Sequence, residues 1–212
     1  MIYKIKEYKN KLIEKAYRDG MKESNAFFGT NWVYGLPNVL ILNNRKEIDN
    51  FMGQKSMGRS VGFSGHRIVY ILDNNNMEKE SIHKKLSDAD YYTLIKHEIC
   101  HLFYYKYSHN CIKPKWLWEG VSIYLSKQTV YTKPKSFLMF IDSDTKNVDS
   151  AFYEGGFAVK LLIENFGKKK ILKLISRSSE VKNKNEFSKL FKKIYNFDLN
   201  YKNFNNLLKK NK

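Results

Sequence analysis

Residues 94–103 read Leu-Ile-Lys-His-Glu-Ile-Cys-His-Leu-Phe, and this stretch decides how the rest of the chain is interpreted. On an α-helix, residues four apart lie one turn apart on the same face, so His97 and His101 can direct their imidazoles at one ion. Glu98 follows the first histidine and can reach a water molecule beside that ion. Apolar residues flank the motif on both sides, which predicts a buried helix over about residues 89–105.

Two histidines make a weak metal site, because catalytic zinc normally takes three protein ligands and leaves a place for water. The downstream candidates for the third ligand are His109, Cys111 and Glu119. His109 follows His101 without a glycine between them, so the metzincin pattern fails. Glu119 lies on a second predicted helix, roughly residues 115–126, with Pro114 at its start. A loop plus half a helix could bring its carboxylate back against the first helix.

Two segments together resemble the paired zinc motifs of the gluzincins, especially the group that contains aminopeptidase N and leukotriene A4 hydrolase. They are residues 97–101, His-Glu-Ile-Cys-His, and residues 116–120, Trp-Leu-Trp-Glu-Gly. A third segment, residues 152–162, begins Phe-Tyr-Glu-Gly-Gly and is similar to the Tyr-Glu-Lys-Gly motif of that group. The resemblance is close over roughly residues 90–165 and general before them.

The resemblance implies one zinc ion held by His97, His101 and Glu119. It also implies Glu98 as the general base and Tyr153 as the stabiliser of the transition-state oxyanion. The expected fold is an α+β, thermolysin-like domain in which a small mixed sheet precedes a helical C-terminal part. The expected activity is hydrolysis of peptide bonds in a peptide or protein substrate.

One departure bears on specificity. The exopeptidases of that group carry Gly-x-Met-Glu-Asn on a substrate-binding strand, and the glutamate of this motif binds the free amino end of the substrate. The corresponding stretch here, residues 61–70, contains no glutamate. The resemblance therefore favours an endopeptidase over an aminopeptidase, with an extended substrate pairing to an edge strand at residues 66–72.

The pattern along the chain predicts a single compact domain over residues 1–212. Its parts are an N-terminal helix within residues 1–30, a sheet portion over 31–75, zinc-site helices over 85–165 and a basic helical extension over 166–212. The first helix is expected at residues 2–23, ending near Gly20, and Ser87 or Asp88 is expected to cap the helix that carries the histidines. The expected strands are 39–42, 59–63 and 67–72, the last two joined through Ser64-Gly65, and the other expected helices are 45–52, 152–165, 169–175, 187–195 and 204–208.

The composition is strongly basic, with 38 Lys and Arg against 21 Asp and Glu and a net charge of +17. Such a surface attracts phosphate, which keeps open a rival class: an inactive or structural gluzincin-fold module that binds an anionic partner through its basic helical tail. Of the basic residues 33 are lysines and only five are arginines. Base recognition relies on arginine, so the composition disfavours nucleic acid. We expect no membrane span, because the sequence has no stretch of about 20 apolar residues. The small number of cysteines, two, and an N-terminal sequence unlike a secretory signal predict a cytoplasmic protein. The sequence leaves the oligomeric state open.

Overall fold

The computed structural model describes residues 6–56, 58–128, 133–144 and 151–210. The described residues combine many helices with one small sheet, so the predicted α+β class is confirmed. The helices and strands are α1 (Lys11–Phe28), β1 (Asn38–Leu42), α2 (Arg45–Met52), β2 (Gly62–Gly65), β3 (Ile68–Leu72), α3 (Met77–Glu80), α4 (Asp88–Tyr107), α5 (Lys115–Ser126), α6 (Gly156–Phe166), α7 (Lys168–Ser176), α8 (Lys184–Tyr195) and α9 (Tyr201–Lys210).

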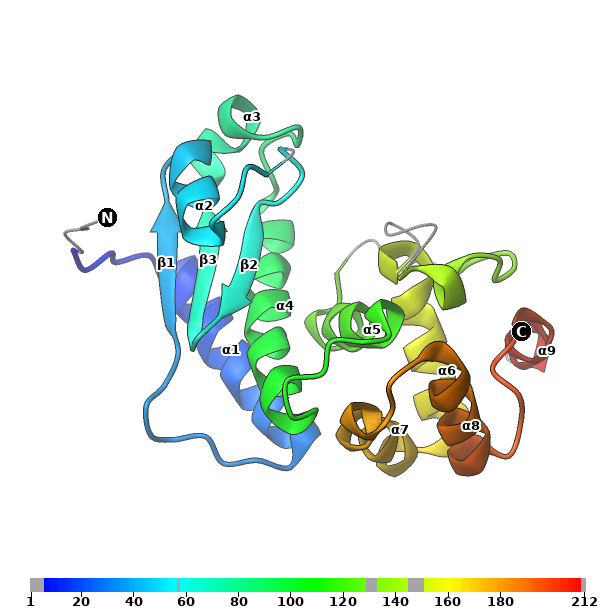
Figure 1. The fold of residues 1–212 in the computed structure, drawn as a ribbon. Coiled ribbons are helices and arrows are strands. Elements are labelled where there is room, and N and C mark those ends of the chain that lie inside the picture. The colour runs from blue at the N-terminus through cyan, green and yellow to red at the C-terminus, as the bar shows by residue number, and fades with distance from the viewer. Residues whose placement is uncertain (1–5, 57, 129–132, 145–150, 211–212) are drawn as a thin grey trace.

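The helix that carries the histidine motif, α4, lies at the centre of the molecule. It packs against α1 and against the sheet on one side and against α5 on the other, and α2 covers the opposite face of the sheet (Figure 1). Its side chains from Ile95 to Tyr104 are all buried, which confirms the predicted buried helix. Ser87 caps its start by accepting a hydrogen bond from the Asp90 amide at 3.1 Å.

The described strands form one sheet in the order β1-β3-β2. β1 runs parallel to β3, with Val39 opposite Val69, whereas β2 runs antiparallel to β3, with Gly62 opposite Ile71. The central strand is therefore β3, and the prediction that residues 66–72 form the substrate-binding edge is wrong. β2 is an edge strand, and it is the edge that packs against α4.

The predicted hairpin exists, but its turn lies two residues further along the chain. Ser64 and Gly65 belong to β2, and His66 and Arg67 form the turn with positive φ angles of 50° and 63°. Two left-handed residues match the twist of a tight hairpin, a conformation that usually selects Asn or Gly. Because Ser-Gly is common turn chemistry and His-Arg is not, the sequence pattern misplaced the turn.

The N-terminal helix differs from its prediction at both ends. Residues 6–10 are not helical, and the Asn10 side chain caps α1 by accepting hydrogen bonds from the amides of Leu12 and Ile13 at 3.0 and 3.2 Å. The helix runs through Gly20 to Phe28. A Cβ on Gly20 would lie 3.0 Å from Ile99 Cδ1 and 3.4 Å from Lys96 Cα, so this glycine allows α1 and α4 to approach closely and does not end the helix. The part of the prediction over residues 1–5 lies outside the described residues.

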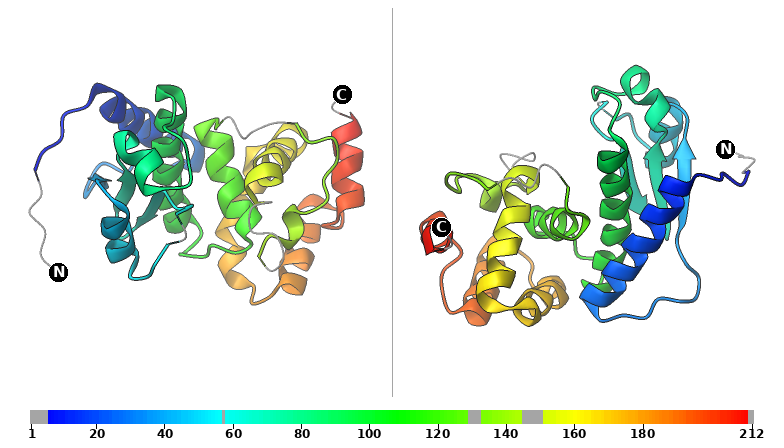
Figure 2. Two further views of the ribbon diagram at one scale, coloured as in Figure 1. Left: turned by 90° about the horizontal axis from the view of Figure 1, so that it is seen from above. Right: turned by 180° about the vertical axis from the view of Figure 1, so that it is seen from behind.

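The C-terminal half is a group of helices, α5–α9, beside α4 (Figures 1 and 2). The four predicted helices after residue 150 are confirmed as α6–α9. α6 begins four residues later than expected, after a π-helical turn over Ala151–Gly155, and α8 and α9 each begin about three residues earlier than expected. Aromatic side chains fill the core of this half: Trp116 is fully buried, and its ring centroid lies 5.1 Å from that of Phe140 and 6.5 Å from that of Phe204. Within the described ranges, no helix is both long and apolar enough to cross a lipid bilayer.

Candidate metal centre

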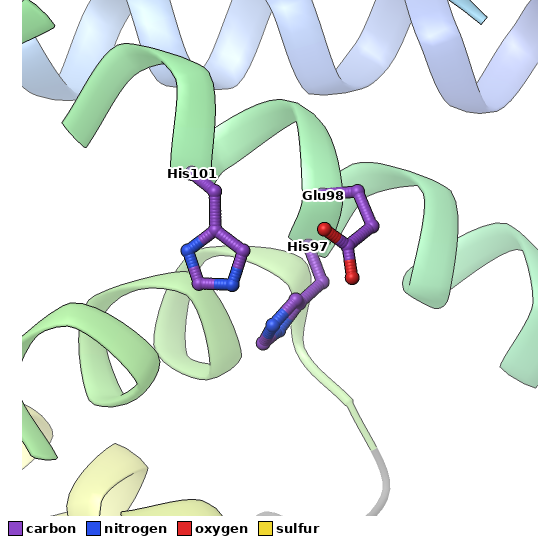
Figure 3. Close-up of side chains that lie close together, drawn as sticks. All are labelled: His97, Glu98 and His101. Atoms are coloured by element: carbon purple, nitrogen blue, oxygen red, sulfur yellow. The ribbon is translucent and has the colours of Figure 1, made fainter. Parts of the chain in front are cut away.

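Three side chains from two helices bring donor atoms to one point. The Nε2 atom of His97 lies 3.2 Å from Oε2 of Glu119, and Nε2 of His101 lies 3.5 Å from the same oxygen. All three residues are at most 4% exposed. Figure 3 shows His97, Glu98 and His101 extending from α4 into the same region. The predicted partners on α4 and α5 therefore meet, and Glu119 is not a surface residue of its helix.

The spacing of these atoms fits metal ligands better than hydrogen bonds. Oε2 of Glu119 makes no hydrogen bond with described residues, although two imidazole nitrogens lie within 3.5 Å. Ligands at the usual zinc distances of about 2.0–2.2 Å and tetrahedral angles would lie about 3.3–3.5 Å from one another. The observed separations are close to this range. The buried group of His97, Glu98 and His101 could hold a metal ion. Oε2 of Glu119 is separated from both imidazole nitrogens by about the distance between two ligands of one zinc ion.

The ionisation of the cluster suits a cation. Burial raises the pKa of Glu119, but the neighbouring His101 and His97 outweigh this effect, so the pKa lies far below its usual range. Burial lowers the pKa of His101 to about 4. For His97 burial also acts to lower the pKa, but Glu119 and Glu98 more than offset it and the pKa is raised. The ionised carboxylate of Glu119 and the neutral imidazole of His101 are the forms that coordinate metals, and His97 would release its proton when an ion binds.

Glu98 lies beside the three donor atoms of the cluster and against the edge strand of the sheet. Its Oε2 is buried and has no hydrogen-bond partner among the described residues, and burial raises its pKa to about 7. A Cβ on Gly62 of β2 would lie 3.1 Å from Oε1 of Glu98 and 3.2 Å from its Cγ. A glycine at this position thus lets the strand pass close to the carboxylate.

The position of Glu119 depends on a close crossing between α5 and a π-helical turn, Ala151–Gly155. A Cβ on Gly120 would lie 2.6 Å from the backbone oxygen of Gly155 and 2.9 Å from Cγ2 of Val159. A Cβ on Gly155 would lie 2.9 Å from the backbone oxygen of Trp116. Gly120 and Gly155 face each other and therefore determine how closely α5 approaches the π-helical turn. This distance in turn positions the carboxylate of Glu119.

We expect Gly120→Ala to destabilise the protein by about 1–3 kcal/mol, because the new methyl group meets rigid backbone and the crossing must open. Without that clash, alanine in a helix interior would stabilise by up to about 1 kcal/mol. Gly20→Ala is the matched control. Its methyl group meets mainly the tip of the Ile99 side chain, which can turn aside, so the loss should be smaller. Urea unfolding of the two variants measures the difference, and an unchanged or raised stability of Gly120→Ala would contradict the role of this crossing.

The π-helical turn brings Phe152, and not its neighbour, to the histidines. The ring centroid of Phe152 lies 6.5 Å from that of His97, with the planes 19° apart. Tyr153 is 61% exposed and does not belong to the buried cluster. The assignment of Tyr153 as oxyanion stabiliser stays a prediction.

Glu154 has a structural role that the sequence pattern did not indicate. It is 5% exposed, and its carboxylate accepts hydrogen bonds from three consecutive amides, those of Leu138, Met139 and Phe140, at 3.0–3.2 Å. The carboxylate therefore holds the segment before the short 3-10 helix Phe140–Asp142 against the π-helical turn. The only sequence feature that marks Glu154 is its place inside the Tyr-Glu-Gly-Gly motif. This local pattern does not indicate that the carboxylate binds the amides of a segment more than ten residues away.

Glu154→Gln should lower the free energy of unfolding by about 1.5–3 kcal/mol, because hydrogen bonds to a charged acceptor are lost in a buried place. The control is Glu164→Gln on α6, whose carboxylate is 45% exposed and lies 3.6 Å from Lys160. Such a surface pair contributes at most about 1 kcal/mol. Chemical denaturation of both variants tests the expectation; equal losses would show that the buried carboxylate is not an anchor.

The rival third ligands lie elsewhere. His109 has a positive φ of 55° in the loop after α4, and the Cys111 thiol donates to the backbone oxygen of Lys113 at 3.4 Å. Cys100 is buried and free, as expected for a small apolar side chain, and burial raises its pKa to about 12.

No family model, no curated protein and no solved structure matches the chain. The geometry of the site therefore carries the functional argument.

Proposed function

We propose that this chain is a zinc-dependent peptidase of the gluzincin type, with a thermolysin-like arrangement of its helices and sheet. The observation that carries the proposal is the approach of one Glu119 oxygen to within 3.2 and 3.5 Å of the two imidazoles, without hydrogen-bond geometry. The order of elements supports it: the sheet and the histidine helix come first, and the carboxylate ligand comes from the next helix.

The donor set favours zinc among the common metals. Two imidazole nitrogens and one carboxylate oxygen form a known catalytic zinc set, in which a fourth position serves water or substrate. Calcium and magnesium prefer sites built from oxygen ligands alone. His97, His101 and Glu119 would hold the ion, and Glu98 would stay free of it as a base.

The remaining chemistry belongs to residues of the chain. A bound zinc ion would supply a Lewis acid that polarises the scissile carbonyl and acidifies water. In the proposed reaction Glu98 takes a proton from the attacking water and passes it to the leaving amine. Its buried surroundings and its unpartnered Oε2 keep this carboxylate available. Tyr153 is proposed as the donor to the oxyanion on the resemblance alone, since Phe152 is the neighbour that contacts His97.

The substrate would be an extended peptide that adds to β2, in place of the predicted edge at residues 66–72. β2 has one neighbouring strand among the described residues, and it passes directly beside Glu98. Main-chain pairing with an edge strand is a common mode of peptide recognition. The residues of β2 are Gly-Phe-Ser-Gly and include no carboxylate that could bind a free amino terminus, which supports endopeptidase over aminopeptidase activity.

The direct test measures zinc content and cleavage of an unstructured protein substrate by the purified chain. We expect about one zinc ion per chain, loss of cleavage after chelation and recovery when zinc is returned. Absence of bound zinc after incubation with excess ion, or cleavage that is indifferent to chelation, would overturn the proposal.

A further inference from the structure

His101 is held on the side away from Glu119 by a residue of α5. Its Nδ1 lies 2.9 Å from the hydroxyl oxygen of Ser122, and both residues are buried, with Ser122 fully so. Ser122 follows Glu119 by three positions, so the two side chains share a face of α5. The same helix therefore contacts both ring nitrogens of His101, through the Glu119 carboxylate at Nε2 and through the Ser122 hydroxyl at Nδ1.

A second contact favours one direction for this hydrogen bond. The Ser122 hydroxyl also lies 3.3 Å from the backbone oxygen of Trp118, which can only accept. If the hydroxyl donates to that oxygen, it must accept from Nδ1–H of His101. The ring then keeps its free lone pair on Nε2, the atom that faces Glu119. The Cys100 thiol also contacts Ser122, but it is a weak hydrogen-bonding group and offers no strong competing acceptor.

Packing adds to this constraint. The Trp118 ring lies over His101, with the centroids 4.1 Å apart and the planes 30° from parallel. The Nδ1 of His97 is buried and makes no hydrogen bond that meets the distance and angle limits with described residues, although the side chain of Gln128 interacts with this imidazole. The two histidines are therefore held by different neighbours, and within the part of the chain that the structure describes the one buried hydroxyl at a ring nitrogen is that of Ser122 on His101.

We propose that Ser122 is a positioning residue that holds His101 in the tautomer presenting Nε2 to the metal. This inference rests on the proposed zinc site and assigns to it a residue outside the ligand set. Groups that hydrogen-bond to metal-ligating histidines fix the ring and raise its basicity, and their loss typically costs 10–100-fold in metal affinity.

The experiment compares zinc dissociation constants of the wild-type chain, Ser122→Ala, Ser122→Thr and Ser126→Ala, measured by competition with a chromogenic chelator. Ser126 is the matched control: it lies one turn further on α5, is 1% exposed and bonds to the backbone oxygen of Ile123 at 3.3 Å. We expect Ser122→Ala to weaken zinc binding about 10–100-fold. Ser126→Ala should leave it unchanged, and Ser122→Thr, which keeps the hydroxyl, should recover most of the affinity.

A second measurement reports the tautomer directly. In zinc-loaded protein with ¹⁵N-labelled histidine, His101 should show a proton on Nδ1 and none on Nε2, with slow exchange that becomes faster in Ser122→Ala. Equal zinc affinity of wild type and Ser122→Ala, or equal weakening by both alanine variants, would overturn the positioning role. A wild-type chain that binds no zinc would instead overturn the proposed function itself, so the two failures are distinguishable.

Discussion

Replacing Glu98 with glutamine is expected to lower the turnover number for peptide cleavage by about 10²–10⁴-fold, the usual contribution of a general base. Glutamine has nearly the same size and cannot take the proton from water. Glu98 is not among the three proposed zinc ligands, so zinc content should stay near that of the wild type. The measurement is steady-state cleavage of a fluorogenic peptide together with metal analysis of the same samples.

The surface variant Glu164→Gln serves as the control for the loss of one negative charge, and it should cleave at the wild-type rate. Circular dichroism and thermal unfolding of the zinc-loaded proteins check that Glu98→Gln keeps its fold. Equal cleavage by wild type and Glu98→Gln would exclude this carboxylate as the base. A variant without zinc would instead place Glu98 in the ligand set.

Glu119→Ala is expected to weaken zinc binding by more than about 100-fold, because it removes one of three proposed ligands, whereas second-sphere changes cost 10–100-fold. The effect appears in stability as well as in affinity. With free zinc at 100 times the wild-type dissociation constant, binding stabilises the wild type by about 2.7 kcal/mol. At the same zinc concentration a 100-fold weaker variant gains only about 0.4 kcal/mol.

Unfolding with and without chelator measures this difference for wild type, Glu98→Gln and Glu119→Ala. The first two should lose about 2.7 kcal/mol on chelation, and Glu119→Ala should lose at most about 0.4 kcal/mol. If zinc stabilises Glu119→Ala as much as the wild type, the carboxylate is not a ligand and the gluzincin assignment fails. The conclusion about Glu119 does not depend on the stability or the cleavage rate of Glu98→Gln.

The two site helices were predictable because local signals and tertiary environment agree there. α5 has the predicted bounds, and α4 has them within two residues, since Ser87 caps α4 and Pro114 precedes α5. The spacing of His97 and His101 on α4 places them on one face. The meeting with Glu119 required a resemblance, because the path of a loop between two helices is not encoded by periodicity. Ser122 was within reach of sequence reasoning, since it shares a helix face with Glu119.

The prediction is wrong at two places where a glycine or serine, residues typical of turns and helix ends, instead lies inside a helix or strand. The sequence pattern predicts that the first helix ends near Gly20, yet this glycine lies inside α1 and allows close contact with Ile99. The pattern also predicts a turn at Ser64 and Gly65, yet these residues continue the edge strand, and His66 and Arg67 take the left-handed turn conformation. In both regions tertiary contacts outweigh local preference, and a single sequence contains no record of those contacts.

The π-helical turn before α6 determines which aromatic ring faces the histidines. A π turn accommodates one more residue than an α turn, and each α-helical residue advances the rotation by about 100°. Suppose that Ala151–Gly155 formed a regular α-helix while α6 stayed in place. Tyr153 would then point in nearly the direction in which Phe152 points now. The winding of a single turn therefore selects between a hydrocarbon ring and a phenol at the edge of the cluster, without any change in the identity of the residues.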